Sequence, residues 1–373
     1  MNRLWAAFAL ILTTALSGCV NAMLTKAIVQ APNQREVPAL FKRRNAGLLE
    51  HEDHTYAAAW KTHVANPPAD IAVAVVDPGN YQLVHAVKTA PLKNGMEGVW
   101  PQSDWKEPPQ PLAGVSEPKG TILILHGFQD TKEAMMHWAL FLAQAGYRVI
   151  LVDLRGHGRS SGSWIGYGAF EVGDLKEVMD DVERRGLLAG RLGVLGLSYG
   201  GSIALELAGH DPRIATVVAL EPFSDPRQAV VDFAHGVVPK LVKNWTPQDF
   251  TRAEAKAAEM AHLQWNQADV LGSVAYIKAP VLYVHALNDH WVDPASADVL
   301  AGHTAGPHEV LTVTFTGVTV EPHVLLSWVL DPIAAPVLRW LDESLLHPGP
   351  DLQARLTNIT HSPGENQTLP ASQ

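Results

Sequence analysis

The chain has 373 residues, of which 47% are hydrophobic and 18% charged, so it can build one large domain or two ordinary ones and is not wholly disordered. Lysine and arginine total 28 against 38 aspartates and glutamates, and this balance of −10 without a basic cluster argues against a nucleic-acid partner. The single cysteine, Cys19, excludes an internal disulfide and any metal site built from several cysteines.

The amino terminus has the pattern of an export signal. Arg3 precedes an uncharged apolar run over residues 4–16, which is shorter than the roughly 20 residues that cross a bilayer as a helix. The run ends in Leu16-Ser17-Gly18-Cys19, which resembles the bacterial lipobox. The resemblance implies cleavage before Cys19, acylation of its sulfur and attachment to a membrane. An ordinary secretory signal with an incidental cysteine is the alternative.

The position after the cysteine bears on where such a lipoprotein is sorted. Residue 20 is valine and not aspartate, and by resemblance to enterobacterial sorting this implies the outer membrane rather than the inner one. We therefore expect residues 1–18 to be a signal peptide and residues 19–70 to be a tether and amino-terminal extension. Stable anchoring needs more than one acyl chain, which the lipoprotein class supplies.

The first elements expected after this extension are a hairpin and a loop. Residues 71–87 alternate apolar and polar side chains around Asp77-Pro78-Gly79-Asn80, which predicts a β-hairpin. Residues 88–118 are rich in proline and glycine and are expected to be loop.

From Lys119 onward, short apolar runs alternate with stretches of helical pattern, which predicts an α/β fold with a mostly parallel sheet covered by helices on both faces. The expected strands cover residues 121–125, 147–152, 192–197, 214–220, 281–285 and 310–315. The expected helices cover residues 131–145, 171–188, 201–209, 294–301 and 322–345, the last interrupted at Asp331-Pro332.

About sixty residues lie between the fourth and fifth expected strands, which is too many for a simple crossover. Their helical composition predicts an inserted cap at about 222–278 over the carboxyl ends of the strands. Five aromatic residues there are candidates either for an apolar acyl pocket or for the cap's own core: Phe223, Phe233, Trp245, Phe250 and Trp265. Residues 347–373 are expected to be a loose tail.

The motif that determines the functional prediction is Gly196-Leu197-Ser198-Tyr199-Gly200. It lies between an expected strand and an expected helix, where Gly-x-Ser-x-Gly forms a sharp turn that holds the serine hydroxyl above the sheet. Glycines at 196 and 200 remove side chains that would clash in that turn. A purely structural turn serine is the alternative interpretation.

On this motif the chain resembles the α/β-hydrolase superfamily of esterases and serine aminopeptidase-like enzymes, over roughly residues 71–346. Residues 153–160, Asp-Leu-Arg-Gly-His-Gly-Arg-Ser, are similar to the loop after the fourth strand in many members. The resemblance implies an α/β-hydrolase fold and a catalytic triad in the order serine, acid, histidine. It implies neither a metal nor an organic cofactor.

The acid is expected just after the fifth strand, where Asp289 and Asp293 compete. Asp293 precedes a proline and suits the N-cap of a helix, which leaves Asp289 as the candidate acid. Glu221 or Asp225, after the preceding strand, is the alternative, because some members of the superfamily keep their acid there.

The base is expected after the last strand, where His323 stands before the last helix. The chain has 17 histidines, so position decides between them. His303 and His308 lie at the amino end of that strand, whereas sites in open α/β sheets gather at the carboxyl ends. His290 adjoins the candidate acid and is too near it in sequence to be the usual base. His323 is therefore the candidate base.

The resemblance also places the oxyanion hole at the backbone N–H groups of Phe128 and Tyr199. Together these residues predict a serine hydrolase that cleaves small-molecule acyl esters. Peptidases, thioesterases and acyltransferases share the same triad, and a non-catalytic envelope lipoprotein on a hydrolase scaffold is a second class of function. Haloalkane dehalogenases and epoxide hydrolases of this fold use an aspartate where Ser198 stands.

Overall fold

The computed structural model describes residues 21–34, 55–91, 97–315, 321–328, 330–349, 351–360 and 368–369. The expected signal peptide, residues 1–18, and the lipidation candidate Cys19 lie outside these residues. Within the part that is described, no helix combines the length and the apolar character needed to cross a membrane.

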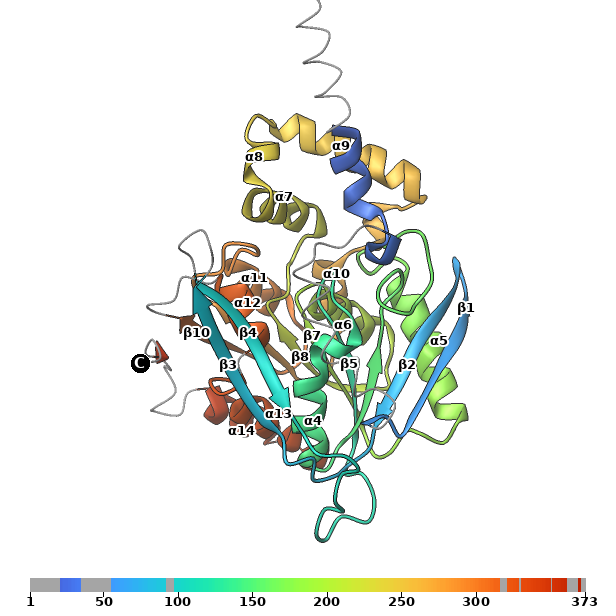
Figure 1. The fold of residues 1–373 in the computed structure, drawn as a ribbon, viewed down its shortest axis with the longest axis vertical. Helices are drawn as coiled ribbons and strands as arrows, with labels where there is room; N and C mark the ends of the chain where they lie inside the picture. Colours follow the sequence, from blue (N-terminus) through green and yellow to red (C-terminus); the bar gives the residue numbers. More distant parts are fainter. Residues whose placement is uncertain are drawn as a thin grey trace, which may run out of the picture.

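A nine-stranded sheet forms the centre of the described chain, in the order β1-β2-β6-β5-β7-β8-β9-β10-β11 (Figure 1). The pairs β1–β2 and β2–β6 are antiparallel, and every later pair is parallel. The strands are β1 (Ala58–Ala65), β2 (Pro68–Val76), β5 (Thr121–Leu125), β6 (Arg148–Val152), β7 (Leu192–Leu197), β8 (Ile214–Leu220), β9 (Val281–Ala286), β10 (His308–Phe315) and β11 (Thr368–Leu369).

Helices cover both faces of this sheet, as the alternating pattern predicts. Successive side chains of a strand point to opposite faces, so Leu123 and Leu125 enter one core while Ile122 and Ile124 enter the other. The first core includes α5 (Glu171–Arg184), α6 (Tyr199–His210), α10 (Val270–Val274) and α11 (Ala295–His303). The second includes α4 (Met136–Gln144), α12 (Pro322–Trp328), α13 (Ala334–Leu346) and α14 (Leu352–Thr360).

The chain between β8 and β9 is largely helical. Helices α7 (Pro226–Val237), α8 (Pro239–Val242) and α9 (Pro247–Ala261) lie at the top of Figure 1, whereas α10 packs against α6. We call α7–α9 the cap. The start of α9 is stabilised by a capping box, in which Thr246 and Asp249 each bond the other's backbone N–H.

The amino-terminal part of the described chain is more structured than a tether, so the boundary expected at residue 71 is corrected. Residues 21–29 form a helix, and its Ile28 and Val29 are buried in the first core. The Tyr167 hydroxyl donates to the carbonyl of Ile28 at 2.7 Å. Strand β1 lies at the edge of the sheet and is only partly buried, so its mixed sequence carries no strong strand signal.

The hairpin expected over residues 71–87 does not form. Strand β2 ends at Val76 and takes its partners, β1 and β6, from outside that segment. The turn that follows β2 packs instead on the second core, where Tyr81 is buried, and the Tyr81 hydroxyl donates to the carbonyl of Asp77 at 2.9 Å. Residues 88–118 are not all loop either, because β3 (Val84–Pro91) pairs with β4 (Glu97–Asp104) in a separate two-stranded sheet.

The carboxyl-terminal prediction is partly right. The helical region breaks at Asp331-Pro332, between α12 and α13, as expected. Residues 347–373 were expected to be loose, but α14 lies within them and buries Leu352, Leu356 and Ile359 in the second core. The apolar spacing of these three residues fits one face of a helix, which explains why the segment folds onto the sheet.

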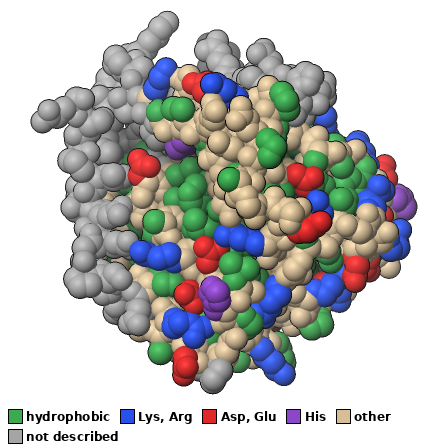
Figure 2. Space-filling model, turned by 90° about the horizontal axis from the view of Figure 1, so that it is seen from below, with side chains coloured by type: hydrophobic (Ala, Val, Ile, Leu, Met, Phe, Trp, Pro, Cys, Tyr) green, Lys and Arg blue, Asp and Glu red, His purple; other side chains and the backbone are tan. Residues whose placement is uncertain are grey.

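Figure 2 views the molecule from below, the side away from the cap in Figure 1. Lysine and arginine side chains lie there among acidic and hydrophobic ones, and the described residues of that face gather no large patch of one charge.

Candidate active site

Ser198 lies in the tight turn between β7 and α6. Its backbone has φ 51° and ψ −113°, a conformation that is uncommon for a residue other than glycine. A Cβ atom at Gly196 would lie 2.2 Å from the carbonyl oxygen of Gly200. A Cβ atom at Gly200 would lie 2.6 Å from the carbonyl oxygen of His126. Both glycines are therefore required by the closeness of the backbone, as the motif predicts.

The candidate acid and base are in direct contact. His323, in the first turn of α12, lies with Nδ1 2.7 Å from Oδ2 of Asp289. The other oxygen of Asp289 accepts hydrogen bonds from the N–H groups of Trp291, at 2.7 Å, and Val292, at 3.0 Å. Burial raises the pKa of Asp289, but His323, His285 and the Val292 N–H outweigh it and hold that pKa well below its usual range. Asp289 is therefore a carboxylate.

Ser198 shares an edge of the sheet with this pair but is not joined to it. Ser198 follows β7, Asp289 follows β9 and His323 follows β10, so all three lie at the carboxyl ends of parallel strands. Among the described residues, the Ser198 hydroxyl makes no hydrogen bond. Catalytic hydrogen bonds are commonly long in free enzymes and shorten when substrate binds.

Two of the competing carboxylates have structural tasks. Asp293 accepts a hydrogen bond from the N–H of Ala295 at 3.0 Å, at the start of α11. Asp225 is the N-cap of α7 and accepts from the N–H of Arg227 at 2.8 Å. Glu221 is different, because its Oε2 lies 3.3 Å from Nδ1 of His323.

His290 connects the acid loop to the segment that carries the base. Its backbone N–H donates to Oε1 of Glu321 at 2.8 Å, and its Nδ1 lies 3.1 Å from Oε2 of the same residue. Because Glu321 stands two residues before His323, this contact holds the loop of Asp289 against the start of α12. The side chain of His290 is exposed and contacts Glu321, not Asp289, which agrees with the prediction that His290 is not the base.

His126 holds the loop that carries Phe128. It is fully buried, its Nε2 accepts the N–H of Leu154 at 3.0 Å, and its Nδ1 lies 2.8 Å from the carbonyl oxygen of Gly127. Nδ1 must therefore carry the proton of a neutral ring, and burial lowers the pKa of His126 accordingly. The ring of Phe128 lies 6.1 Å from that of Tyr199, so the two candidate oxyanion residues are neighbours.

Tyr199 is held by a network that the sequence analysis missed. Its hydroxyl donates to Oε1 of Glu171 at 2.9 Å and accepts from the N–H of Tyr167 at 3.1 Å. Burial raises the pKa of Tyr199 well above its usual value, so the phenol stays neutral. These two hydrogen bonds hold the side chain of Tyr199, and so help to fix the residue that directly follows Ser198. The sequence does not indicate this role for Glu171, because an acidic residue is common in the first turn of any helix.

An aromatic row joins the cap to the candidate site. The ring of Phe233, on α7, lies 5.5 Å from Phe128 and 5.8 Å from Trp291, and Trp291 lies 5.5 Å from His323. The other cap-region aromatics pack elsewhere: Trp245 against Phe250, Trp265 against Tyr167, and Phe223 in the first core. Phe233 is therefore the member of the predicted set that reaches site residues. Trp291, two residues after Asp289, was not predicted.

Glu221, Asp289 and His323 are also the residues of the described chain that come close enough to share a metal ion, with ligand atoms within 4.8 Å of one another. Nδ1 of His323 and Oδ2 of Asp289 are already bonded to each other. A cation would have to displace the proton between them, so this donor set fits an acid–base pair better than a metal centre.

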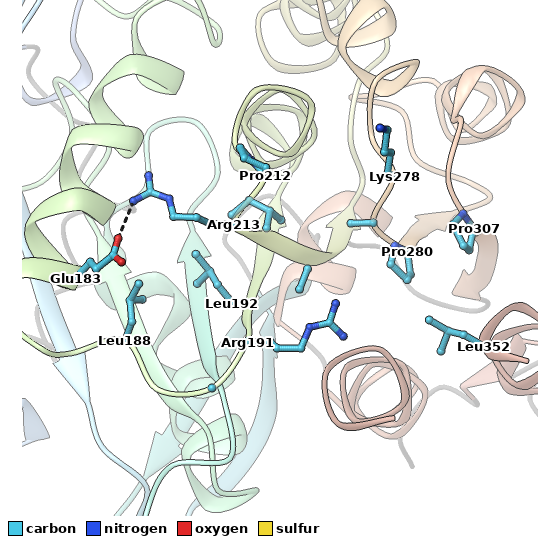
Figure 3. Close-up of a pocket in the computed structure, with 14 residues that line it drawn as sticks. Glu183, Leu188, Arg191, Leu192, Pro212, Arg213, Lys278, Pro280, Pro307 and Leu352 are labelled. Atoms are coloured by element: carbon cyan, nitrogen blue, oxygen red, sulfur yellow. Dashed lines mark hydrogen bonds and ion pairs between the residues drawn. The ribbon is translucent and has the colours of Figure 1, made fainter. Parts of the chain in front are cut away.

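A cavity of about 570 Å³ lies at the amino ends of the central strands, opposite to the end that carries Ser198 (Figure 3). Leu192, Ile214 and Pro280 line it, at the amino ends of β7, β8 and β9, and an ion pair between Arg213 and Glu183 forms part of its wall. It is therefore separate from Ser198 and the pair Asp289–His323.

Comparison with known proteins places part of this chain among hydrolases. Residues 116–272 match the protein family described as "Serine aminopeptidase, S33". The matched segment contains Phe128, Ser198, Tyr199 and the cap, and it ends before Asp289 and His323.

A thermostable monoacylglycerol lipase from a Bacillus species is 29% identical over 203 residues, which cover 51% of this chain and 78% of the relative. Epoxide hydrolase B of Mycobacterium tuberculosis is 36% identical over 109 residues, which cover 28% of this chain and 29% of the relative. The structure of a 2,6-dihydroxy-pseudo-oxynicotine hydrolase matches with a TM-score of 0.51 at 17% identity, over 78% of this chain and 68% of that one. The chain has the α/β-hydrolase fold, and its relatives support a hydrolase function.

Proposed function

We propose that this chain is a serine hydrolase that cleaves carboxylic esters through an acyl-enzyme and is anchored to the bacterial cell envelope. The observation that carries the proposal is the 2.7 Å contact between His323 and the ionised Asp289, at the same edge of the sheet as the Ser198 turn. A buried carboxylate bonded to a histidine orients the ring and stabilises its cation.

In the first half of the reaction, the Ser198 oxygen attacks the ester carbonyl and its proton passes to Nε2 of His323. Nε2 is the nitrogen left for this proton, because Nδ1 is bonded to Asp289. The negative charge that forms on the carbonyl oxygen is stabilised by the N–H groups of Phe128 and Tyr199. Collapse of this intermediate releases the alcohol, which takes the proton from Nε2 and leaves an acyl-Ser198.

In the second half, water attacks the acyl carbon and gives a proton to Nε2. The bond between the acyl carbon and the Ser198 oxygen then breaks, the serine oxygen takes the proton back from Nε2, and the carboxylic acid departs. A serine at position 198 supports acyl transfer rather than epoxide opening, since the epoxide hydrolases of this fold use an aspartate there. This distinction matters because one of the relatives is an epoxide hydrolase.

The surroundings of the site favour an apolar acyl group. Phe128, Phe233 and Trp291 place aromatic rings along one side of the candidate catalytic residues. Aromatic rings provide large apolar contact area. The relative named as a monoacylglycerol lipase supports a small-molecule acyl ester, rather than a protein, as substrate.

Anchoring through Cys19 would place the membrane on the cap side of the molecule. Trp245, which precedes α9, donates from Nε1 to Oδ1 of Asn21 at 3.1 Å. Asn21 is two residues from Cys19, and two residues span at most about 7.6 Å between Cα atoms. An acyl chain on Cys19 would therefore attach next to the cap. The residue after Cys19 supports the outer rather than the inner membrane.

A fluorophosphonate probe tests the proposed nucleophile. The full chain in mild detergent is compared with Ser198→Ala and with Ser116→Ala, a control at an exposed serine. Labelling and turnover of p-nitrophenyl esters, from acetyl to palmitoyl, are expected for the wild type and the control and not for Ser198→Ala. Labelling without ester turnover would indicate a peptidase, thioesterase or acyltransferase. Failure of the wild type to label would favour a non-catalytic scaffold.

Anchoring is tested separately in a bacterial host fed an alkyne analogue of palmitate. The wild type should incorporate the label and sediment with outer-membrane vesicles, and Cys19→Ser should do neither. Equal incorporation by both proteins would contradict acylation at this residue.

A further inference from the structure

Glu221 is a second carboxyl group beside the candidate base. It directly follows β8, it is fully buried, and its backbone has φ 51°. Its N–H donates to the carbonyl of Val284 at 2.7 Å, which fixes the residue between β8 and β9. Its Oε2 lies 3.3 Å from Nδ1 of His323, and within the described part of the chain neither side-chain oxygen has a hydrogen-bond partner. A buried carboxyl group without partners is costly and calls for an explanation.

The two carboxyl groups that face His323 differ in their charge. Asp289 accepts two backbone N–H bonds in addition to the bond from His323, which stabilises its ionised form. Glu221 receives no hydrogen bond from any residue that the structure describes, and burial together with the charges of Asp289 and Glu321 raises its pKa well above the usual value. The pair therefore holds one negative charge, on Asp289, and one proton, on Glu221.

We propose that Glu221 is a positioning residue for His323, a reserve acid that stays protonated while Asp289 is charged and becomes the partner of Nδ1 when that charge is removed. This inference rests on the proposed function of Ser198 and His323. It explains why an unpaired carboxyl group is kept within 3.3 Å of Nδ1.

Electrostatics explains why Glu221 should take over the role of Asp289 when that residue is substituted. If Asp289 becomes alanine, the nearest negative charge facing Glu221 disappears, and its ionised form is less disfavoured. His323, protonated during the reaction, then needs an anion within reach, and Glu221 is the carboxyl group already there. Of the other charged groups that face Glu221, Glu321 remains bonded to His290.

The test is a cycle of four proteins: wild type, Glu221→Gln, Asp289→Ala and the double variant. Asp289→Asn serves as a second acid variant that keeps the shape of the side chain. Glu206→Gln is the matched control, because Glu206 is also a buried glutamate with an unpartnered Oε2 and does not contact His323. Each protein is assayed for p-nitrophenyl ester kcat and KM and for the rate of fluorophosphonate labelling.

We expect Asp289→Ala to lower kcat by about 10³- to 10⁴-fold, as loss of a triad acid does. Adding Glu221→Gln should lower it by about a further tenfold, with KM unchanged, whereas adding Glu206→Gln should not. Both variants keep His323 as the base, so the part of the rise of kcat with pH that comes from ionisation of Glu221 should appear in Asp289→Ala and be missing from the double variant. Equal kcat and equal pH profiles for Asp289→Ala and the double variant would overturn the inference.

A readout without turnover separates the two proposals. Infrared difference spectra of wild type and Glu221→Gln should show the carbonyl band of a protonated, buried carboxyl group that is lost in the variant. Absence of that band would contradict a protonated Glu221. Failure of the wild type to label or hydrolyse esters would instead contradict the proposed function, whatever the spectra show.

Discussion

The ring of Phe233 meets the ring of Phe128 edge-on, with centroids 5.5 Å apart and planes at 82°. One ring belongs to the cap and the other to the loop that follows β5. The cap is therefore in direct contact with the loop proposed to hold the oxyanion. A substitution of either ring should change the packing beside the candidate catalytic residues.

Replacement of Phe233 by alanine should change acyl-chain selectivity. Removing the ring opens space beside Phe128 and Trp291, so kcat/KM for long-chain p-nitrophenyl esters should rise relative to acetyl ester by about 3- to 10-fold. Phe141→Ala is the control, because Phe141 packs edge-on against Trp138 on α4, which is not part of the site. An unchanged ratio of long-chain to acetyl rates would show that Phe233 does not contact the acyl group.

The two carboxyl groups beside His323 should affect stability with opposite dependence on pH. The folded-state pKa of Glu221 is raised, so its contribution is fully present below its unfolded value and is lost as pH rises toward the folded pKa. Unfolding free energies by urea between pH 5 and 8 should thus fall more steeply for wild type than for Glu221→Gln, by up to about 1.4 kcal/mol per pH unit. Parallel curves would contradict a raised pKa for Glu221.

Asp289 should show the reverse. Its folded-state pKa is lowered, so its contribution is present above the unfolded pKa and is lost as pH falls through and below about 4. The difference in unfolding free energy between wild type and Asp289→Asn should therefore shrink as pH is lowered from 5 toward 2. A difference that grows in this window would refute the assignment of a stabilised carboxylate.

The helix over residues 21–29 should contribute to stability and not only link the chain to its amino terminus. Val29 is completely buried, whereas Met23 in the same helix is 58% exposed. Val29→Ala should lower the free energy of unfolding by about 1–3 kcal/mol, and Met23→Ala by less than about 0.5 kcal/mol. Equal effects of the two substitutions in urea unfolding would mean that the helix is not packed on the core.

Much of the architecture was predictable from local pattern. Continuous apolar runs located β5 to β10 because a parallel strand covered on both faces must be apolar on both sides. The Ser198 turn was predictable because only glycine fits where the backbones of residues 196 and 200 come close. The order of strands along the chain then placed Asp289 and His323 at the same edge.

The failures have a common cause. Strand β1 and the hairpin around Asp77 were misjudged because a strand's partner is chosen by contacts between residues far apart in sequence. Helix α14 and the helix over residues 21–29 were misjudged because their apolar faces are stabilised by cores that other segments build.

The sequence by itself determined the residue types at the strand ends: Ser198, Glu221, Asp289 and His323. Only the tertiary structure decided which of the two carboxyl groups is ionised and which is protonated. Asp289 and Glu221 are both carboxyl groups next to Nδ1 of His323. The N–H groups of Trp291 and Val292 donate to Asp289, whereas no described residue donates a hydrogen bond to Glu221. Because burial favours the neutral form unless hydrogen bonds offset it, one group is charged and the other keeps its proton.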